Sequence, residues 1–456
     1  MTEFRIESDS MGEVQVPAHA LFGAQTQRAV NNFPLSGRTM PPAFIRALAM
    51  VKAACARANA KLGELDKATA EAIAAGAEAI VEGRHMDQFP VDVFQTGSGT
   101  SSNMNMNEVL AHLAGQTLGS AVHPNDQVNR GQSSNDVIPT ALQVALALEV
   151  RNGVMPALAY LTNVIEAKAQ QLDGIIKTGR THLMDAMPIG LGDELRIWQR
   201  QLEDNRDRLQ DALPRLLELP LGGTAVGTGV NAHPQMAAEA AGELTRLSGL
   251  KFRTCKHPGS RMAAQDVSVE ISGHLRTLAV SLMKIANDLR WMNSGPLAGL
   301  AEIELEALQP GSSIMPGKVN PVIPEAVAMV CAEVMGRDVS VGIAGQSGNF
   351  QLNVMLPLLA DSLLTSTHML SNAMRLLADR AIVGFRINQP GIEKALSRNP
   401  ILVTALNARI GYDKAAAIAK QAYKEGRPIA EVVREQTDLD DAEIAKLLDP
   451  ARLARP

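Results

Sequence analysis

The sequence predicts an all-α fold, in which a long-helix central bundle lies between a mixed irregular and helical N-terminal domain and a small helical C-terminal domain. Only 3% of the 456 residues are aromatic, whereas alanine, leucine and methionine are plentiful. This composition favours the close packing of long helices over the bulkier cores of sandwiches and barrels. Apolar residues also recur with a helical period over several long segments, which is the second observation behind the prediction.

The helical period is clearest in three apolar seams. The first alternates steps of four and three until Ser294-Gly295-Pro296 ends the helix, and it consists of Ile271, Leu275, Leu278, Leu282, Ile285, Leu289 and Met292. The second consists of Leu356, Leu359, Leu363, Leu370, Ala373 and Leu377. The third consists of Leu195, Trp198, Leu202 and Leu209. Three long seams predict a multi-helix bundle, because each seam needs a neighbouring helix to cover it.

The pattern changes at two points that we expect to be domain boundaries. The first long helix is expected to begin near Asn135, and shorter amphipathic segments such as 415–426 follow Gln389-Pro390. The predicted domains are therefore an N-terminal domain over 1–134, a central helical bundle over 135–388 and a small C-terminal domain over 389–456.

Charge and cysteine content exclude several classes of partner. The 43 basic and 48 acidic residues give a net charge of −5, which does not suit a nucleic-acid-binding protein. The three cysteines, Cys55, Cys255 and Cys331, lie far apart and favour a reducing compartment. Residues 1–16 lack the pattern of a targeting signal, and no later stretch is expected to span a membrane. These observations predict a cytoplasmic protein without a nucleic-acid or membrane partner.

Five segments rich in glycine, hydroxyl and amide residues interrupt the seams, at 95–107, 123–136, 179–185, 221–234 and 311–321, and we expect them at helix ends. Ser98 and Thr100 precede a helix expected at 107–113, and Ser133-Ser134-Asn135 precede one expected at 140–150. A helix N-terminus binds anions through its free N–H groups. Any one such segment could be an ordinary helix cap. Together with Gly311–Pro321, however, these two segments predict a small substrate with two anionic ends.

The segment Gly311–Pro321 carries the densest chemistry of the three. Glycine and proline keep it irregular, Ser312 supplies a hydroxyl, and Lys318 and Asn320 offer hydrogen-bond donors to an anion. The alternative is a surface turn, although an Ile-Met pair between hydroxyls and a lysine is unusual in a turn.

Metal and nucleotide sites have little support. The nine histidines show none of the spacings typical of metal ligands, so we expect no metal and no cofactor. The glycine-rich stretch 222–229 lacks the ending of a phosphate-binding loop and is interpreted as a close-packed corner.

His182 is the best candidate for acid–base chemistry, because it lies in a polar segment close to Asp185, whereas His112, His274 and His368 lie in helical stretches. Glu325 is expected on the first turn of the helix after Pro321 and Pro324. There it could serve catalysis or simply complement the helix dipole.

The segment Gly311–Pro321 resembles the signature of the fumarase/aspartase superfamily. The resemblance extends from Asp9-Ser10-Met11-Gly12 to Gly411-Tyr412-Asp413-Lys414. Class II fumarases are the most similar, on the segments Gly97–Thr100, His123–Asp126, Ser133–Asp136 and Gly223–Gly229. Position 182 is histidine, as in fumarases, where aspartases usually carry glutamine.

The resemblance implies a metal-independent lyase that reversibly hydrates fumarate to L-malate in the tricarboxylic acid cycle, through an aci-carboxylate intermediate. It implies a homotetramer with a twenty-helix bundle, whose active sites are each shared by three subunits. By similarity, Ser312 removes the C3 proton, Lys318 and Asn320 hold the carboxylate, and His182 paired with Glu325 handles the water. The substrate-binding residues implied are Ser98, Thr100, Ser133, Ser134, Asn135, Thr181, Lys318 and Asn320. A second dicarboxylate site is implied at His123, Asn125 and Asp126.

Two segments depart from the fumarase pattern. Residues 257–264 replace an Asn-Lys-Phe-Glu-Ala type segment, and Val322-Ile323-Pro324 stands where many fumarases have Thr-Gln-Cys. The alternatives are therefore an aspartate ammonia-lyase or another C4-dicarboxylate lyase. A third alternative is a retired lyase kept as a structural protein, as in relatives found in the lens.

Overall fold

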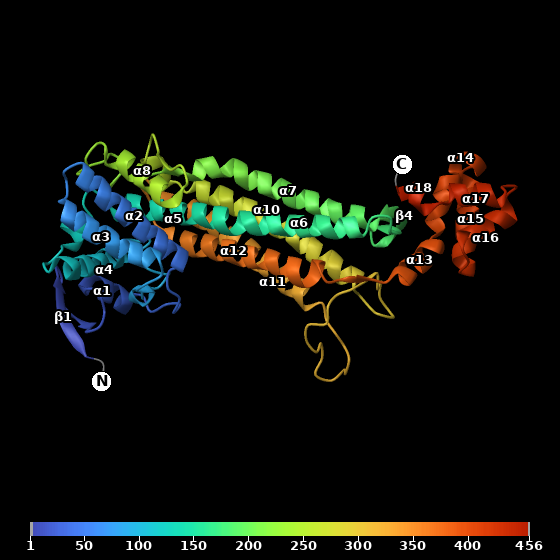
Figure 1. Ribbon diagram of the computed structural model, residues 1–456, viewed down its shortest axis with the longest axis horizontal. Coiled ribbons are helices and arrows are strands. Elements are labelled where there is room, and N and C mark those ends of the chain that lie inside the picture. The colour runs from blue at the N-terminus through green and yellow to red at the C-terminus, as the bar shows by residue number, and fades with distance from the viewer. Residues whose placement is uncertain (1–2, 455–456) are drawn as a thin grey trace. The chain divides into compact units, whose positions relative to one another are not determined.

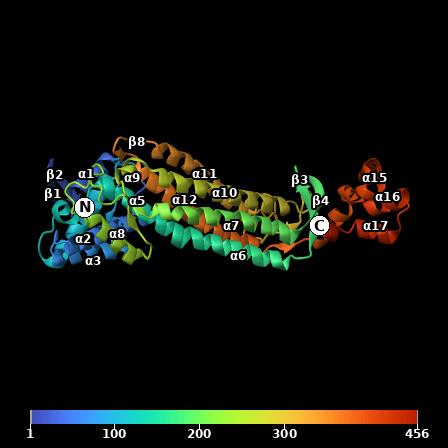
Figure 2. The same cartoon turned by 90° about the horizontal axis from the view of Figure 1, so that it is seen from above.

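A computed structural model describes residues 3–454, and helices dominate it, which confirms the predicted all-α class (Figures 1 and 2). The chain divides into two compact units. Unit 1 comprises Met1–Pro156, Arg206–Ala279 and Cys331–Ser371, and unit 2 comprises Ala157–Asn205, Val280–Val330 and Asn372–Pro456. The predicted domain limits stay a prediction, although α5 begins at Ser134 and α13 at Gln389.

Unit 1 is a helical assembly with short hairpins at its edge. Strand β1 (Phe4–Asp9) pairs antiparallel with β2 (Gly12–Pro17). The helices are α1 (Ala24–Asn32), α2 (Pro42–Lys61), α3 (Lys67–Val81), η1 (Met86–Gln88), α4 (Thr100–Leu118), η2 (Pro124–Val128), α5 (Ser134–Glu149), η3 (Val150–Val154), α8 (Met236–Ser248) and α9 (Gly259–Ala263). Two small strand pairs, β5 (Glu218–Leu219) with β6 (Arg253–Thr254) and β8 (Gly348–Asn349) with β9 (Leu352–Asn353), complete it. Helix α2 packs against α3, α5 and α8.

The long helices confirm the three predicted seams. They are α6 (Met155–Gln171), α7 (Leu191–Leu216), α10 (Asp266–Met292), α11 (Val322–Gly345) and α12 (Leu356–Leu377), which continues into η4 (Ala378–Ile382). Every seam residue named above is buried. Burial of whole apolar stripes stabilises these helices far more than their intrinsic propensity does.

Unit 2 holds the β3–β4 hairpin, a second small strand pair and a cluster of short helices. Strand β3 (Ile176–Thr181) pairs with β4 (Met184–Gly190), and β7 (Ile303–Glu304) pairs with β10 (Arg386–Ile387). The helices are α13 (Gln389–Ser397), η5 (Pro400–Leu406), α14 (Asn407–Ile410), α15 (Tyr412–Glu425), α16 (Ile429–Gln436), α17 (Asp441–Leu447) and α18 (Pro450–Ala454). Leu402, Leu406, Ile418 and Val432 belong to a separate apolar core among these helices.

Three local expectations were wrong. The segment 179–185 is not a helix end but the turn of the β3–β4 hairpin. Helix α4 begins at Thr100 rather than near 107, because its asparagines, of poor helix propensity, are buried and several of them are hydrogen-bonded. Helix α5 begins at Ser134, close to the start near Asn135 expected for the first long helix and not near 140, because Ser133 and Asp136 form a capping box.

The expectation that no stretch could span a membrane also needs correction. The continuous helical segment Ser134–Gln171 is long and apolar enough to do so by length and composition alone. In the structure, however, every residue from Asp136 to Ala147 is buried, and α5 packs against α2. This part of the segment is a core helix of unit 1.

Candidate active site

The residues expected to carry chemistry fall into two groups, one in each unit. In unit 1, the structure joins Ser98, Thr100 and Ser134, which we call the hydroxyl cluster. The Thr100 hydroxyl lies 2.8 Å from the Ser98 hydroxyl and 2.7 Å from the Ser134 hydroxyl. The N-termini of α4 and α5 therefore meet at one place, where both offer N–H groups to an anion.

Two glycines shape the turn into α4. A side chain at Gly97 would place its Cβ 1.8 Å from the Val354 carbonyl oxygen, and the Gly97 carbonyl accepts a hydrogen bond of 3.0 Å from the Leu356 N–H. Gly99 has φ of 72°, a left-handed conformation that glycine adopts without cost. Close backbone contact and left-handed geometry thus fix Ser98 beside Thr100.

Asp136 fastens the start of α5 to the 222–229 loop. Its Oδ1 accepts from the Ser133 N–H at 3.0 Å, and its Oδ2 accepts from the N–H groups of Gly222 and Thr224 at 2.9 and 3.0 Å. Burial raises the pKa of this carboxyl, while these backbone donors oppose the rise. The Asn135 amide in turn donates to the Ala225 carbonyl at 2.8 Å. Ser133, Ser134 and Asn135 are therefore held in fixed positions.

The 222–229 loop is the close-packed corner that was expected. A Cβ at Gly223 would lie 2.7 Å from atoms of both Pro258 and Met262, and one at Gly227 would lie 2.8 Å from Gly259. The segment 257–264, which departs from the fumarase pattern, is thus the surface on which this loop packs.

Lys52 was missed by the sequence analysis. It is fully buried in α2, and its ammonium donates to Asn129 Oδ1 and Gln132 Oε1, both at 2.9 Å. Asn103 and Asn107 of α4 also donate to Asn129 Oδ1, at 3.3 and 3.2 Å. This polar network supports the chain immediately before Ser133. The only sign of a buried Lys52 in the sequence is that it is the single lysine in the otherwise apolar stretch 48–56.

We expect Lys52 to make stability depend on pH. Burial lowers its pKa from 10.5 to about 7 in the folded protein. Between those values the unfolded chain binds a proton that the folded chain releases, so the free energy of unfolding rises with pH. Relative to Lys52→Met, the wild type should gain about 1.4 kcal/mol per pH unit between pH 7.5 and 10. Denaturant unfolding at several pH values measures this, and a pH-independent difference would contradict it.

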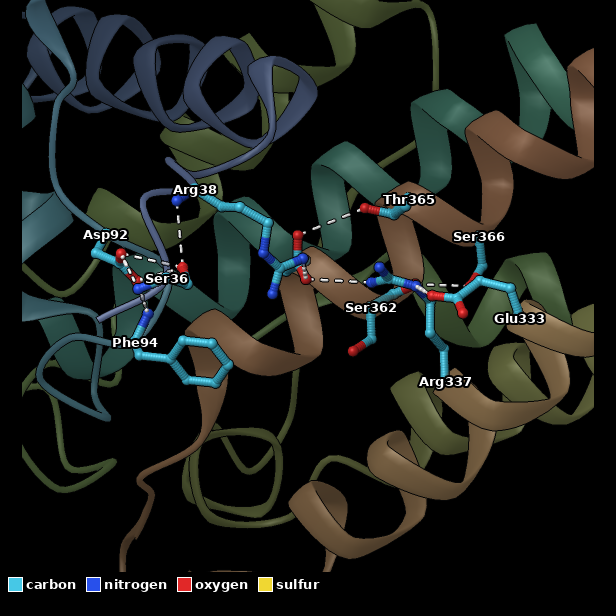
Figure 3. Close-up of polar contacts among 10 residues, drawn as sticks. Ser36, Arg38, Asp92, Phe94, Glu333, Arg337, Ser362, Thr365 and Ser366 are labelled. Carbon is cyan, nitrogen blue, oxygen red and sulfur yellow. Dashed lines mark hydrogen bonds and ion pairs between the residues drawn. The ribbon is translucent and has the colours of Figure 1, made fainter. Parts of the chain in front are cut away.

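Ion pairs and backbone hydrogen bonds hold residues 36–38 and the segment 92–94 that precedes Ser98, as Figure 3 shows. Asp361 of α12 accepts from Arg38 at 3.0 Å and from Arg337 of α11 at 3.1 Å. Asp92 accepts from the N–H groups of Ser36 and Phe94, both at 2.8 Å. Residues 36–38 thus connect the segment 92–94, which leads to the hydroxyl cluster, with α11 and α12.

His123 and Asn125, two of the residues expected at a second dicarboxylate site, line a cavity of about 800 Å³ in unit 1. Nδ1 of His123 accepts from the N–H groups of Asn125 and Asp126, at 3.3 and 3.1 Å. The exposed imidazole can therefore present its other nitrogen as a donor. Arg5 and His112 line the same cavity.

In unit 2, His182 lies at the tip of the β3–β4 hairpin. Thr181 pairs with Met184, so His182 and Leu183 form a two-residue turn, with φ of 55° and 60°. Such a turn suits the twist of the strands but disfavours residues other than glycine, with asparagine, aspartate and histidine tolerated better than leucine. Among residues 3–454 the exposed His182 side chain has no hydrogen-bond partner.

The Gly311–Pro321 loop closes on itself and surrounds Ser312 with donors. Its ends are joined by the Gly311 N–H to the Lys318 carbonyl and by the Asn320 amide to the Gly311 carbonyl, both at 2.7 Å. The Ser312 oxygen accepts from the N–H groups of Ile314 and Met315, at 3.2 and 3.1 Å. Two donors on one hydroxyl oxygen favour its ionised form.

Lys318 and Asn320 line a cavity of about 510 Å³ with Asn293, Ile303 and Leu305. Glu325 lies on the first turn of α11, as expected. Within residues 3–454, no hydrogen bond or ion pair joins His182 to Ser312, Lys318 or Glu325. Unit 2 thus carries these groups on separate segments.

Comparison with known proteins identifies the family. A family model described as "Lyase" matches residues 12–336, and one described as "Fumarase C C-terminus" matches residues 402–455. The chain is 60% identical over 453 residues to fumarate hydratase class II 2 of Pseudomonas aeruginosa, covering 99% of each chain. It is 57% identical over 450 residues to fumarate hydratase class II of Xylella fastidiosa, covering 99% of this chain and 95% of that one.

The structure agrees with these relatives. A crystal structure of recombinant class II fumarase from Schistosoma mansoni superimposes with a TM-score of 0.96 and 36% sequence identity, over 100% of both chains. The motifs, the fold and the full-length similarity all lead to one assignment. The chain belongs to the class II fumarate hydratase family.

Proposed function

We propose that this chain catalyses the reversible hydration of fumarate to L-malate. The observation that carries the proposal is the Gly311–Pro321 loop, where the Ser312 oxygen accepts two backbone N–H groups close to Lys318 and Asn320. A C–H bond beside a carboxylate is weakly acidic, so its removal needs a strong base and donors that meet the charge developing on the carboxylate.

In the direction of dehydration, Ser312 Oγ takes the C3 proton of malate. The electron pair moves into the adjacent carboxylate, which becomes an aci-carboxylate dianion held by Lys318 and Asn320. The C2–O bond then breaks, and His182, supported by Glu325, gives the departing hydroxide its proton. The double bond of fumarate forms as the dianion collapses.

The hydroxyl cluster, with Ser133, Asn135 and Thr181, would hold the rest of the dicarboxylate. Hydroxyls and helix N-termini suit this role because they donate hydrogen bonds without adding charge that must be neutralised in the free enzyme. His123, Asn125 and Asp126 would form a second dicarboxylate site.

We further propose a cytoplasmic homotetramer whose active sites combine loops from three subunits. Helix α11 supports this, because it carries large apolar side chains on its exposed side as well as on its buried side: Val327 and Val334 are buried, while Met329, Val339 and Ile343 are 68%, 62% and 54% exposed. Large apolar side chains left exposed on one chain are typical of a surface that another chain covers. The three free cysteines suit a reducing compartment.

The test is the ultraviolet absorbance of fumarate, with purified protein given L-malate in one cuvette and L-aspartate with magnesium in another. We expect the signal to grow from malate alone. Growth from aspartate alone would make the chain an ammonia-lyase and direct attention to 257–264. No growth in either cuvette would favour a different substrate or the structural-protein alternative.

A further inference from the structure

Four charged side chains, Lys177, Arg180, Glu194 and Glu302, form a largely buried network along the β3–β4 hairpin. The Lys177 ammonium donates to Glu194 Oε2 and to Glu302 Oε2, both at 2.7 Å. Arg180 donates to the other oxygen of Glu302, also at 2.7 Å. The side chains of Lys177 and Glu302 are only 2% and 6% exposed. Glu302 is therefore the one carboxylate that holds both cations of strand β3.

Glu302 also belongs to the segment that lines one side of the cavity of about 510 Å³ containing Lys318 and Asn320. Its N–H donates to the Met292 carbonyl at 2.8 Å, and its carbonyl accepts from the Asn388 N–H at 3.0 Å. Ile303 and Leu305, which follow it, line the cavity that contains Lys318 and Asn320. One buried side chain thus connects the hairpin that carries His182 with a wall of this cavity.

The hairpin needs such an anchor, because its tip is strained and unsupported. His182 and Leu183 both adopt left-handed backbone conformations that cost energy for residues of their kind. The His182 imidazole is exposed and has no hydrogen-bond partner within residues 3–454. Its position is consequently set by the backbone of the hairpin, and that backbone is held by Lys177 near its base and by Arg180 near its tip.

We propose that Glu302 is a positioning residue that fixes His182 for protonation of the departing hydroxide. This inference rests on the proposed function. Without the Glu302 charge, Lys177 keeps Glu194 as a partner, but the Arg180 side chain loses its only charged partner within residues 3–454. The hairpin can then shift at Arg180, two residues before His182. Ser312 lies on a separate loop, so removal of the C3 proton is preserved.

The experiment compares two rates in the full-length protein. In deuterium oxide with L-malate, deuterium entering C3 reports on proton removal by Ser312, and fumarate absorbance reports on the complete reaction. In Glu302→Gln, we expect fumarate formation to fall by about 10- to 100-fold. The ratio of C3 exchange to fumarate formation should rise severalfold, and Glu302→Asp should recover part of the lost rate.

Glu243→Gln is the matched control, because Glu243 is likewise shared by two cations, Arg57 and Arg246, on the helix α8 of unit 1. We expect it to lose some stability while keeping the wild-type ratio. Arg180→Gln serves if Glu302→Gln fails to fold, since it breaks only the Arg180 contact and should raise the same ratio. The proposal would be overturned if C3 exchange and fumarate formation fell by the same factor in Glu302→Gln, or in Arg180→Gln if Glu302→Gln does not fold. Wild-type protein that forms no fumarate from malate would instead overturn the proposed function.

Discussion

Replacing Ser312 with alanine is expected to lower kcat for malate dehydration by about 10³-fold or more, within the range typical of removing a catalytic base. The Ser312 oxygen accepts two backbone N–H groups, and no other hydroxyl of the Gly311–Pro321 loop has this arrangement among the described residues. Fumarate absorbance measures the turnover, and size-exclusion chromatography checks the assembly. The assembly should be unchanged, because the hydrogen bonds of the serine side chain lie within its own loop.

Ser313→Ala is the matched control for this variant. Ser313 is the exposed neighbour of Ser312 and lacks its pair of backbone donors. We expect it to stay within about threefold of the wild-type rate, as is usual for surface changes that remove no key interaction. If Ser312→Ala kept near-normal activity while Ser313→Ala lost it, the base would have been assigned to the wrong hydroxyl.

The helical bundle could be predicted because its signal is local and repeated. Each turn of the helix 266–292 brings another apolar residue to the same face, and all seven residues of that seam are buried. The loops of the hydroxyl cluster could also be found, because hydroxyls and glycines group within a few residues of one another. That Thr100 and Ser134 touch could not be found in this way, because 34 residues separate them and only the packing of α4 and α5 brings them together.

The hairpin and the buried lysine could not be predicted for a different reason. The turn at His182-Leu183 lacks the Asn-Gly or Asp-Gly signal of a two-residue hairpin, so its polar neighbours suggested a helix end instead. Lys52 lies in an apolar helix, where a lone lysine usually reaches solvent along the surface. Its partners, Asn129 and Gln132, are more than 70 residues away in sequence. In both cases tertiary contacts outweigh the local pattern.

His182→Asn is expected to lower kcat by about 10²- to 10³-fold, because asparagine cannot supply the proton that the departing hydroxide needs. Asparagine is the right replacement, since it tolerates the φ of 55° at this position better than most residues do. The hairpin should therefore keep its shape, and thermal unfolding should show a variant at least as stable as the wild type. The rates are measured with malate and fumarate as separate substrates.

A loss of activity without a loss of stability would separate the chemical role of His182 from its place in the turn. His257→Asn is the control, because His257 is also an exposed loop histidine and should keep the wild-type rate. His182→Ala should lose as much activity as His182→Asn and also some stability, since alanine is less suited than asparagine to a left-handed turn. If His182→Asn turned over malate at a near-normal rate, the proton would have to come from another group, and the hairpin would serve only to shape the site.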